Sequence, residues 1–144
     1  MKRTEIKKRK VKAMKGKVNE MNGTYESFGK FVESKRLERG ISLRRMAELM
    51  DLSPAFWSDI EKDRKNPPAL DKLELLAEKL CLSDEDKGIM LDLAGKRRDT
   101  VAPDIPAYIM GNDYVAAALR TVRDLGASEE DWEHFVEELK KRKG

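Results

Sequence analysis

The chain has 144 residues, of which 40% are hydrophobic and 40% are charged, with 30 basic residues against 27 acidic ones, one Cys and one His. This length allows one domain or a small domain with an appendage. One Cys and one His exclude an internal disulfide and the usual three- or four-ligand zinc site, and no apolar run reaches the roughly 18 residues of a membrane span. We therefore expect a cytoplasmic protein that needs no metal or other cofactor.

The positive charge is concentrated at the start of the chain. Residues 1–20 hold nine basic and two acidic residues, a net charge of +7, so that the remaining residues sum to −4. A run this basic and this poor in apolar residues cannot bury enough surface to fold alone. We expect residues 1–23 to form a disordered arm. This arm either binds nucleic acid electrostatically or is a solvated tail, or it is an extension upstream of an alternative translation start at Met14 or Met21.

From residue 24 onward the residue pattern is helical, because Leu, Glu, Lys, Arg, Met and Ala dominate and strand-like alternation is missing. The apolar spacing and the capping residues predict helices over 25–39, 43–50, 54–62, about 69–80, 84–95, 113–125 and 129–143. The core stripe of the first helix is expected at Phe28, Phe31, Val32 and Leu37. The prediction is an all-α fold with a five-helix bundle in residues 24–95, a charged, proline-containing connector over 96–106, and a helical pair in 107–144.

The most informative stretch is residues 42–61, where a tight turn joins two short helices. Ala47 is small, as needed where the helices cross, and Asp51 stands at the turn, where few residues other than Gly tolerate a positive φ. A third set of positions is apolar and is expected to pack back on the preceding helices: Leu52, Trp57 and Ile60. This pattern indicates a helix-turn-helix, which presents its second helix to the DNA major groove.

The sequence Lys35–Met50 (KRLERGISLRRMAELM), followed by residues 53–61, resembles the phage repressor and Cro-like (Xre) helix-turn-helix domain over about residues 28–82. The Ile60-Glu61 pair, the basic Arg64-Lys65 and Pro67 fit the pattern of that family. The resemblance implies five helices with the third in the major groove, dimers bound to operators, and regulation of transcription. It also implies a structural ion pair between Arg36 and Glu61, which joins the first helix to the end of the third.

Two departures from the family pattern bear on the DNA contacts. The family usually has Gly at the position of Asp63, so this turn either holds Asp in a left-handed conformation or is built differently. Polar residues usually occupy the positions of Pro54, Ala55 and Asp59, so two of the expected base readers are absent. Because few residues of the third helix can read bases directly, specificity is expected to depend also on DNA shape or on the basic arm.

The expected DNA contacts fall into two groups. The outward face of the third helix would hold Ala55, Ser58, Asp59 and Lys62. Of these, Asp59 can accept a hydrogen bond from a cytosine amino group, Ser58 can contact either kind of base edge, and Ala55 can touch a thymine methyl. Contacts to the DNA backbone are expected from Ser42, Arg44, Ser53, Lys62, Arg64 and Lys65.

No pattern of residues points to catalysis. His134 lies on a Glu- and Lys-rich helix without a nucleophile motif or a Gly-rich phosphate loop, so we interpret it as a surface imidazole. Cys81 follows an apolar helix and is interpreted as a buried thiol that behaves as a small apolar residue. The sequence therefore predicts no catalytic residue, no metal ligand and no enzyme activity.

The helical pair in 107–144 has more apolar surface than its two helices can bury on each other. Self-association is the preferred interpretation, because a twofold dimer would read an inverted repeat in DNA. The alternative is a surface for a second protein, as in an antitoxin that neutralises a toxin. The leading hypothesis is a sequence-specific, dimeric transcriptional repressor that binds double-stranded DNA. A protein-interaction module on a helix-turn-helix scaffold and a nonspecific nucleoid-binding protein are the alternatives.

Overall fold

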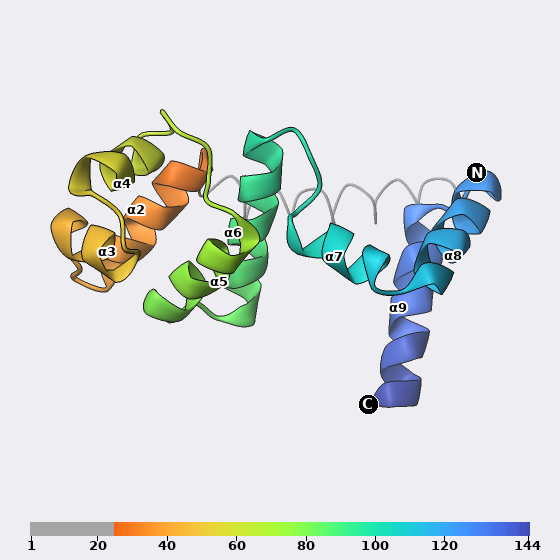
Figure 1. The fold of residues 1–144 in the computed structure, drawn as a ribbon. Coiled ribbons are helices and arrows are strands. Elements are labelled where there is room, and N and C mark those ends of the chain that lie inside the picture. The colour runs from red at the N-terminus through yellow and green to blue at the C-terminus, as the bar shows by residue number, and fades with distance from the viewer. Residues whose placement is uncertain (1–24) are drawn as a thin grey trace. The chain divides into compact units, whose positions relative to one another are not determined.

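The computed structural model describes residues 25–144, which form eight helices and no strand (Figure 1). The fold is all-α, as predicted. The helices are α2 (Phe28–Glu38), α3 (Leu43–Leu49), α4 (Pro54–Glu61), α5 (Leu70–Lys79), α6 (Asp84–Arg97), α7 (Asp104–Met110), α8 (Asp113–Asp124) and α9 (Glu129–Lys143). The described residues divide into two compact units, 25–108 and 109–144. The predicted arm of residues 1–23 lies outside the described residues.

Serine side chains start five of these helices. Each hydroxyl accepts a hydrogen bond from the backbone N–H three residues later, which satisfies one of the unpaired donors of the first turn. The capping residues are Ser27, Ser42, Ser53, Ser83 and Ser128. In α9 the cap is reciprocal, because the backbone N–H of Ser128 also donates to Asp131 Oδ2 at 2.8 Å. The capping pattern thus explains where these helices begin.

Six helices end in a residue with a left-handed backbone. These residues have φ between 51° and 69° and are Gly40, Asp51, Asp63, Cys81, Asp99 and Gly126. After α5, for example, the N–H of Cys81 donates to the carbonyl of Glu78 at 3.0 Å and the N–H of Leu82 donates to that of Ala77 at 2.9 Å. Such bonds close the last turn. The interpretation of Cys81 as buried was wrong: the residue is exposed, because it belongs to this cap and not to the apolar face of α5.

The core of unit 25–108 lies between α2, α3, α4, α5 and α6. Figure 1 shows α2 between the α3–α4 pair and the α5–α6 pair, and α2 contacts both α4 and α6. The largest fully buried apolar side chains are Trp57, Phe28, Phe31, Met46, Met50, Ile60, Leu73, Leu76, Leu80, Met90 and Val32. Burial of these side chains is the main stabilising contribution to this unit.

The prediction that Leu37 belongs to the core was wrong, because its side chain is 60% exposed. The buried stripe of α2 runs from Phe28 through Phe31 and Val32 and continues to Arg36, eight residues after Phe28. Positions i, i+3, i+4 and i+8 share one helix face, whereas i+9 lies opposite it. A charged residue therefore occupies the core position, and the apolar residue next to it faces solvent.

The predicted connector over 96–106 is shorter in the structure, where residues 98–103 link two helices. α6 continues through Lys96 and Arg97, and α7 begins at Asp104. Pro106 is the third residue of α7, within the first turn, where a backbone N–H has no partner inside the helix and its loss breaks no bond. The unit 25–108 therefore extends beyond the five predicted helices into the start of α7.

The unit 109–144 contains the helical pair α8 and α9. Its bounds agree with the predicted helices to within one residue. Gly126, with φ of 69°, ends α8, and the capping box at Ser128 begins α9 two residues later. None of the residues of α8 and α9 is fully buried. This unit therefore presents a large share of its apolar side chains at its surface.

Candidate nucleic-acid interface

The turn between α3 and α4 is closed by the backbone of Asp51. Its φ is 56°, as the sequence predicted for this position, and its N–H donates to the carbonyl of Glu48 at 3.1 Å. The next N–H, of Leu52, donates to the carbonyl of Ala47 at 2.9 Å, and Ala47 is fully buried. Lys72 on α5 adds a bond from Nζ to the carbonyl of Met50 at 3.2 Å. The turn is thus held to the end of α3 by two backbone bonds and to α5 by the Lys72 side chain.

Helix α4 buries one side and presents the other to solvent. Ser53 caps it, Pro54 takes the first helical position, and Trp57, Ile60 and Glu61 are buried. The predicted base-reading residues lie on the remaining surface of this helix. Ala55 and Lys62 are exposed, whereas Ser58 and Asp59 are half-buried. The structure therefore brings the four residues of the expected outward face together along one helix and its cap.

The buried side of α4 is held by a network of charged hydrogen bonds. Arg36 Nε donates to Glu61 Oε2 at 2.8 Å, and Arg36 Nη2 donates to Glu61 Oε1 at 2.9 Å. The Trp57 indole N–H also donates to Glu61 Oε2, and Arg36 Nη1 donates to the carbonyl of Ile41 at 2.9 Å. This two-pronged geometry fits the planar guanidinium of Arg. The pair joins α2 to the end of α4 and so fixes the roll of α4 about its axis.

The turn after α4 is built around Asp63, which has φ of 58°. Of the two alternatives for this position, the left-handed one is present. The Asp63 carboxylate accepts a hydrogen bond from the Ser27 hydroxyl and one from the Gly29 N–H at 2.9 Å. Gly29 permits this approach, because a Cβ there would lie 2.2 Å from the carbonyl oxygen of Glu61. Asp at the usual glycine position therefore ties the end of α4 to the beginning of α2.

Two arginines at the end of α6 hold the same turn from another side. Arg97 Nη2 donates to the carbonyl of Asp63 at 2.9 Å, and Arg98 Nη2 donates to the carbonyl of Pro67 at 2.7 Å. Neither contact was predicted from the sequence, because both arginines were expected in a connector. Between the two acceptors lie Arg64 and Lys65, which are exposed. The loop that presents these two basic side chains is thus fixed at both ends.

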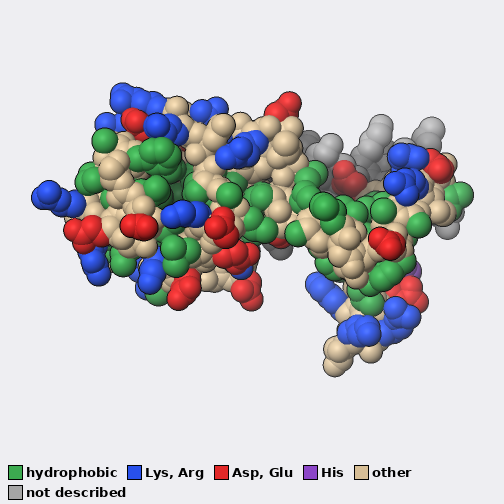
Figure 2. Space-filling view, viewed as in Figure 1, with side chains coloured by type: hydrophobic (Ala, Val, Ile, Leu, Met, Phe, Trp, Pro, Cys, Tyr) green, Lys and Arg blue, Asp and Glu red, His purple; other side chains and the backbone are tan. Residues whose placement is uncertain are grey.

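The interface has a distinct pattern of charge. Figure 2 shows Lys and Arg side chains gathered where α4 ends and the next loop begins, the part of the chain that holds Lys62, Arg64 and Lys65. Arg64 Nη1 lies 3.7 Å from Asp59 Oδ1, so the acidic residue on α4 has a basic partner. This exposed pair is weak in water, and its arginine is free to turn toward a phosphate. The negative charge of Asp59 is therefore partly balanced within the site.

The predicted contacts at helix starts serve the fold as well. The Ser42 hydroxyl accepts from the Arg45 N–H at 3.0 Å, and the Ser53 hydroxyl accepts from the Phe56 N–H at 3.1 Å. Each hydroxyl keeps its own O–H donor, and each lies at a helix N-terminus, where anions are favoured. Arg44 is exposed in the first turn of α3. These three side chains can therefore donate to phosphate without disturbing the caps.

Phe56 is a feature of the site that the sequence analysis missed. Its side chain is 39% exposed, although it stands next to Trp57, which is fully buried. Lys65 Nζ lies 4.3 Å from the centroid of the Phe56 ring. The signal available in the sequence was the position of Phe56, outside the stripe made by Trp57, Ile60 and Glu61.

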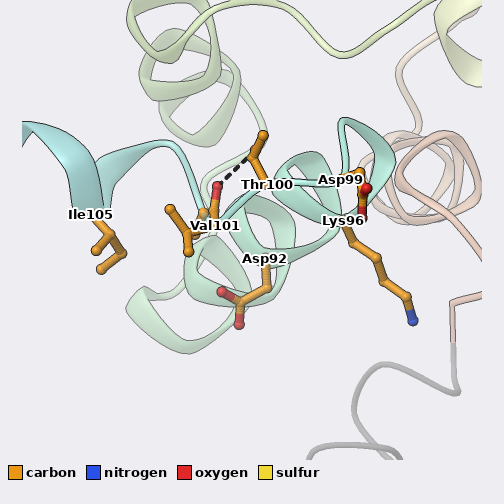
Figure 3. Close-up of a pocket in the computed structure, with 7 residues that line it drawn as sticks. Asp92, Lys96, Asp99, Thr100, Val101 and Ile105 are labelled. Carbon is orange, nitrogen blue, oxygen red and sulfur yellow. Dashed lines mark hydrogen bonds between the residues drawn. The ribbon is translucent and has the colours of Figure 1, made fainter. Parts of the chain in front are cut away.

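A hollow of about 550 Å³ lies beside the end of α6, away from the predicted contacts, and is lined by Asp92, Lys96, Asp99, Thr100, Val101, Ala102 and Ile105 (Figure 3). Partial burial, together with the negative charge of Asp104, raises the pKa of the Asp92 carboxyl above its ordinary value. Asp104 Oδ1 is itself buried and has no hydrogen-bond partner in the described part of the chain. This hollow holds none of the residues expected to contact DNA.

The described residues contain no group of three or more His, Cys, Asp or Glu side chains that could hold a metal ion. Across residues 25–144, no helix has the length and apolar character needed to cross a membrane.

Residues 27–87 match a family model described as a helix-turn-helix domain. No curated protein sequence matches the chain. Among solved structures, the chain is similar to one from a SinR protein/SinI protein complex, with 22% identity, a TM-score of 0.41, and coverage of 81% of this chain and 97% of that chain. The segment matched by this family model, residues 27–87, contains every residue of the candidate interface.

Proposed function

We propose that the protein is a cytoplasmic, sequence-specific DNA-binding regulator of transcription that acts as a dimeric repressor and reads an inverted repeat with α4. The proposal rests on one observation: the loop that presents Arg64 and Lys65 is fixed in position beside the exposed face of α4. Asp63, Arg97 and Arg98 hold that loop through hydrogen bonds. A helix in the major groove is positioned by neighbouring hydrogen-bond donors that contact the DNA phosphates. This loop would supply such donors.

The proposed contacts divide into those that read bases and those that bind the DNA backbone. Ala55, Ser58 and Asp59 face outward along α4 and would meet base edges in the groove. Six residues would contact phosphates: Ser42, Arg44, Ser53, Lys62, Arg64 and Lys65. They lie at the starts of α3 and α4 and around the end of α4, which are the places where a groove-bound helix passes the DNA strands.

The dimer in this proposal is formed through the unit 109–144. Exposed apolar side chains are dense there: Met110, Tyr114, Leu119, Leu125, Trp132, Phe135 and Val136. Surfaces of this kind usually mark a protein contact. A second copy of the chain would cover them and would set two α4 helices about 34 Å apart, one turn of DNA. Sedimentation of the full chain tests this contact, and a Trp132→Asp, Phe135→Asp variant should sediment as a monomer.

The same apolar surface favours a second candidate function. A different protein could occupy it, as in a toxin-neutralising or regulator-binding protein built on a helix-turn-helix scaffold. The two candidates differ in their response to salt. DNA affinity falls steeply with salt because bound cations are released, whereas an apolar protein contact changes little.

The experiment that tests the proposed function is selection from a randomised duplex library by the purified protein at near-physiological salt. We expect an inverted repeat to be enriched, both by the full chain and by a chain that begins at Met21. The shorter chain also tests a role for the basic arm, because a nonspecific DNA-binding protein driven by that arm would lose its binding. If neither chain enriches a sequence, the protein-partner function takes precedence.

A further inference from the structure

Phe56 is an apolar side chain in an unusual place. The other large apolar residues of α4, Trp57 and Ile60, are 0% and 1% exposed, whereas Phe56 is 39% exposed. Phe56 is the third residue of α4, so it lies in the first turn. In a helix that enters the major groove, the N-terminal residues are those that reach the base edges. An exposed aromatic ring therefore stands at the end of α4 that would lie deepest among the bases.

The ring is held in place by the loop that follows α4. Lys65 Nζ lies 4.3 Å from the ring centroid, a geometry that attracts a cation to an aromatic face. The backbone of the loop is itself fixed to α4, because the N–H groups of Arg64 and Lys65 both donate to the Asp59 carbonyl, at 2.8 and 3.3 Å. Lys65 covers one side of Phe56, and the exposed remainder of the ring faces away from the core.

Phe56 also stands next to the proposed base-reading residues. Phe56 and Asp59 are three residues apart on α4 and so lie on neighbouring parts of one helix face. Ala55, which precedes Phe56, is exposed as well. In the major groove the thymine methyl is the apolar group that base pairs display, and all other readable groups there are hydrogen-bond donors or acceptors. An apolar ring among the base-reading residues therefore matches the thymine methyl group.

From this placement we infer that Phe56 is a specificity-determining residue that contacts a thymine methyl group and so selects a T·A pair in the operator. This inference rests on the proposed function, since it requires α4 to lie in the major groove. Lys65 has a double role in this arrangement. Its ammonium holds the ring in position, and its charge would lie beside the phosphate that flanks the same base pair.

The test compares thymine with deoxyuridine, which lacks only the methyl group. Each thymine of the duplex selected by the full chain is replaced singly by deoxyuridine, and binding is measured for the wild type and for Phe56→Ala. We expect one position at which the wild type loses about fourfold in affinity, the change that corresponds to burying one methyl-sized group. Phe56→Ala should bind the two duplexes equally well at that position.

This readout is a ratio of two affinities measured with one protein sample. A variant that is partly unfolded binds both duplexes less well by the same factor, so a loss of stability leaves the ratio unchanged. One variant serves as a control. Leu37→Ala removes an exposed apolar side chain from α2, outside the proposed interface. It should keep the wild-type ratio at the position that depends on Phe56.

The outcomes separate this inference from the proposed function. If the wild type enriches a duplex but its thymine-to-deoxyuridine ratios match those of Phe56→Ala at every position, Phe56 does not read thymine and only this inference is overturned. If the wild type enriches no duplex at all, the proposed function and the inference fall together.

Discussion

Arg98 Nη2 donates a hydrogen bond to the backbone carbonyl of Pro67 at 2.7 Å, and this bond links the end of α6 to the loop after α4 across 31 residues of sequence. Arg97 forms a similar bond to the carbonyl of Asp63. Both arginines stand at the end of α6 and precede α7, so the segment that leads toward the unit 109–144 also holds the proposed phosphate-binding loop. The position of Arg64 and Lys65 therefore depends on residues distant in sequence.

Replacing both arginines, Arg97→Gln with Arg98→Gln, should lower the affinity for the selected duplex about tenfold, since the loop loses two fixed attachment points worth about 1 kcal/mol or less each in binding. Backbone amides of residues 63–67 should exchange their hydrogens faster in the free variant. If the affinity falls while this exchange stays at the wild-type rate, the arginines contact phosphate directly and do not position the loop.

The buried pair of Arg36 and Glu61 predicts a large loss of stability when one partner is removed. Glu61→Gln leaves the guanidinium of Arg36 without a charged partner in the core, a change that typically costs about 3–5 kcal/mol. Denaturant unfolding measures this free energy. Glu48→Gln is the matched control, because Glu48 pairs with Arg45 at 3.0 Å on the exposed surface, where a pair contributes about 0.5 kcal/mol. Equal effects of the two substitutions would contradict the structural role of the buried pair.

The left-handed backbone of Asp63 predicts different stabilities for two substitutions that both remove its carboxylate. Asp63→Gly loses the hydrogen bonds from Ser27 and Gly29 but accepts φ of 58° without strain. Asp63→Ala loses the same bonds and adds strain, so it should be less stable than Asp63→Gly by about 1 kcal/mol. Thermal unfolding of the two variants and the wild type gives the order. An alanine variant as stable as the glycine variant would show that the turn rearranges.

The proposed phosphate contacts predict a specific change in salt dependence. The slope of log affinity against log salt should fall in magnitude by about 0.9 for each of Lys62→Gln, Arg64→Gln and Lys65→Gln. This is the number of counterions released from DNA per neutralised phosphate. Titrations of the selected duplex at several salt concentrations measure the slope. Lys79→Gln on α5 is the control and should leave the slope unchanged. Weaker binding with an unaltered slope would place these side chains away from the phosphates.

Asp92 predicts a dependence of stability on pH. Its folded pKa is raised by partial burial and by the charge of Asp104, so the charged form is disfavoured in the folded state. The folded state gains from this group below the pKa of the unfolded chain, and that gain is lost as the pH rises through the folded pKa. Asp92→Asn should therefore raise the melting temperature slightly at pH 7 and have little effect near pH 3. A gain of the same size at both pH values would assign the effect to another cause.

Local signals in the sequence predicted the helices well. Serine caps, Pro54 at a first helical position and Asp51 at the tight turn each depend on neighbouring residues alone. Leu37 was misplaced for a different reason. Its neighbour Arg36 takes the core position because Glu61, 25 residues away, provides a buried partner. α7 was missed because a proline in a first turn looks like a proline in a linker.

The candidate interface was predictable only in part. The residues of α4 follow from helix periodicity, which placed Ala55, Ser58, Asp59 and Lys62 opposite the buried stripe. The bonds from Arg97 and Arg98 join segments more than 30 residues apart, and no local pattern encodes them. The contact of Lys65 with Phe56 likewise depends on the path of the loop, which Asp63 sets.

The exposed left-handed residue after α5 makes the chain convenient for labelling. Cys81 is the single cysteine, and its φ of 51° is one that glycine adopts without strain. Cys81→Gly would therefore yield a cysteine-free background at little cost to the fold. A new cysteine at Ala55, carrying a spin label, would then report the separation of two α4 helices within an assembled pair of DNA-free chains by electron resonance.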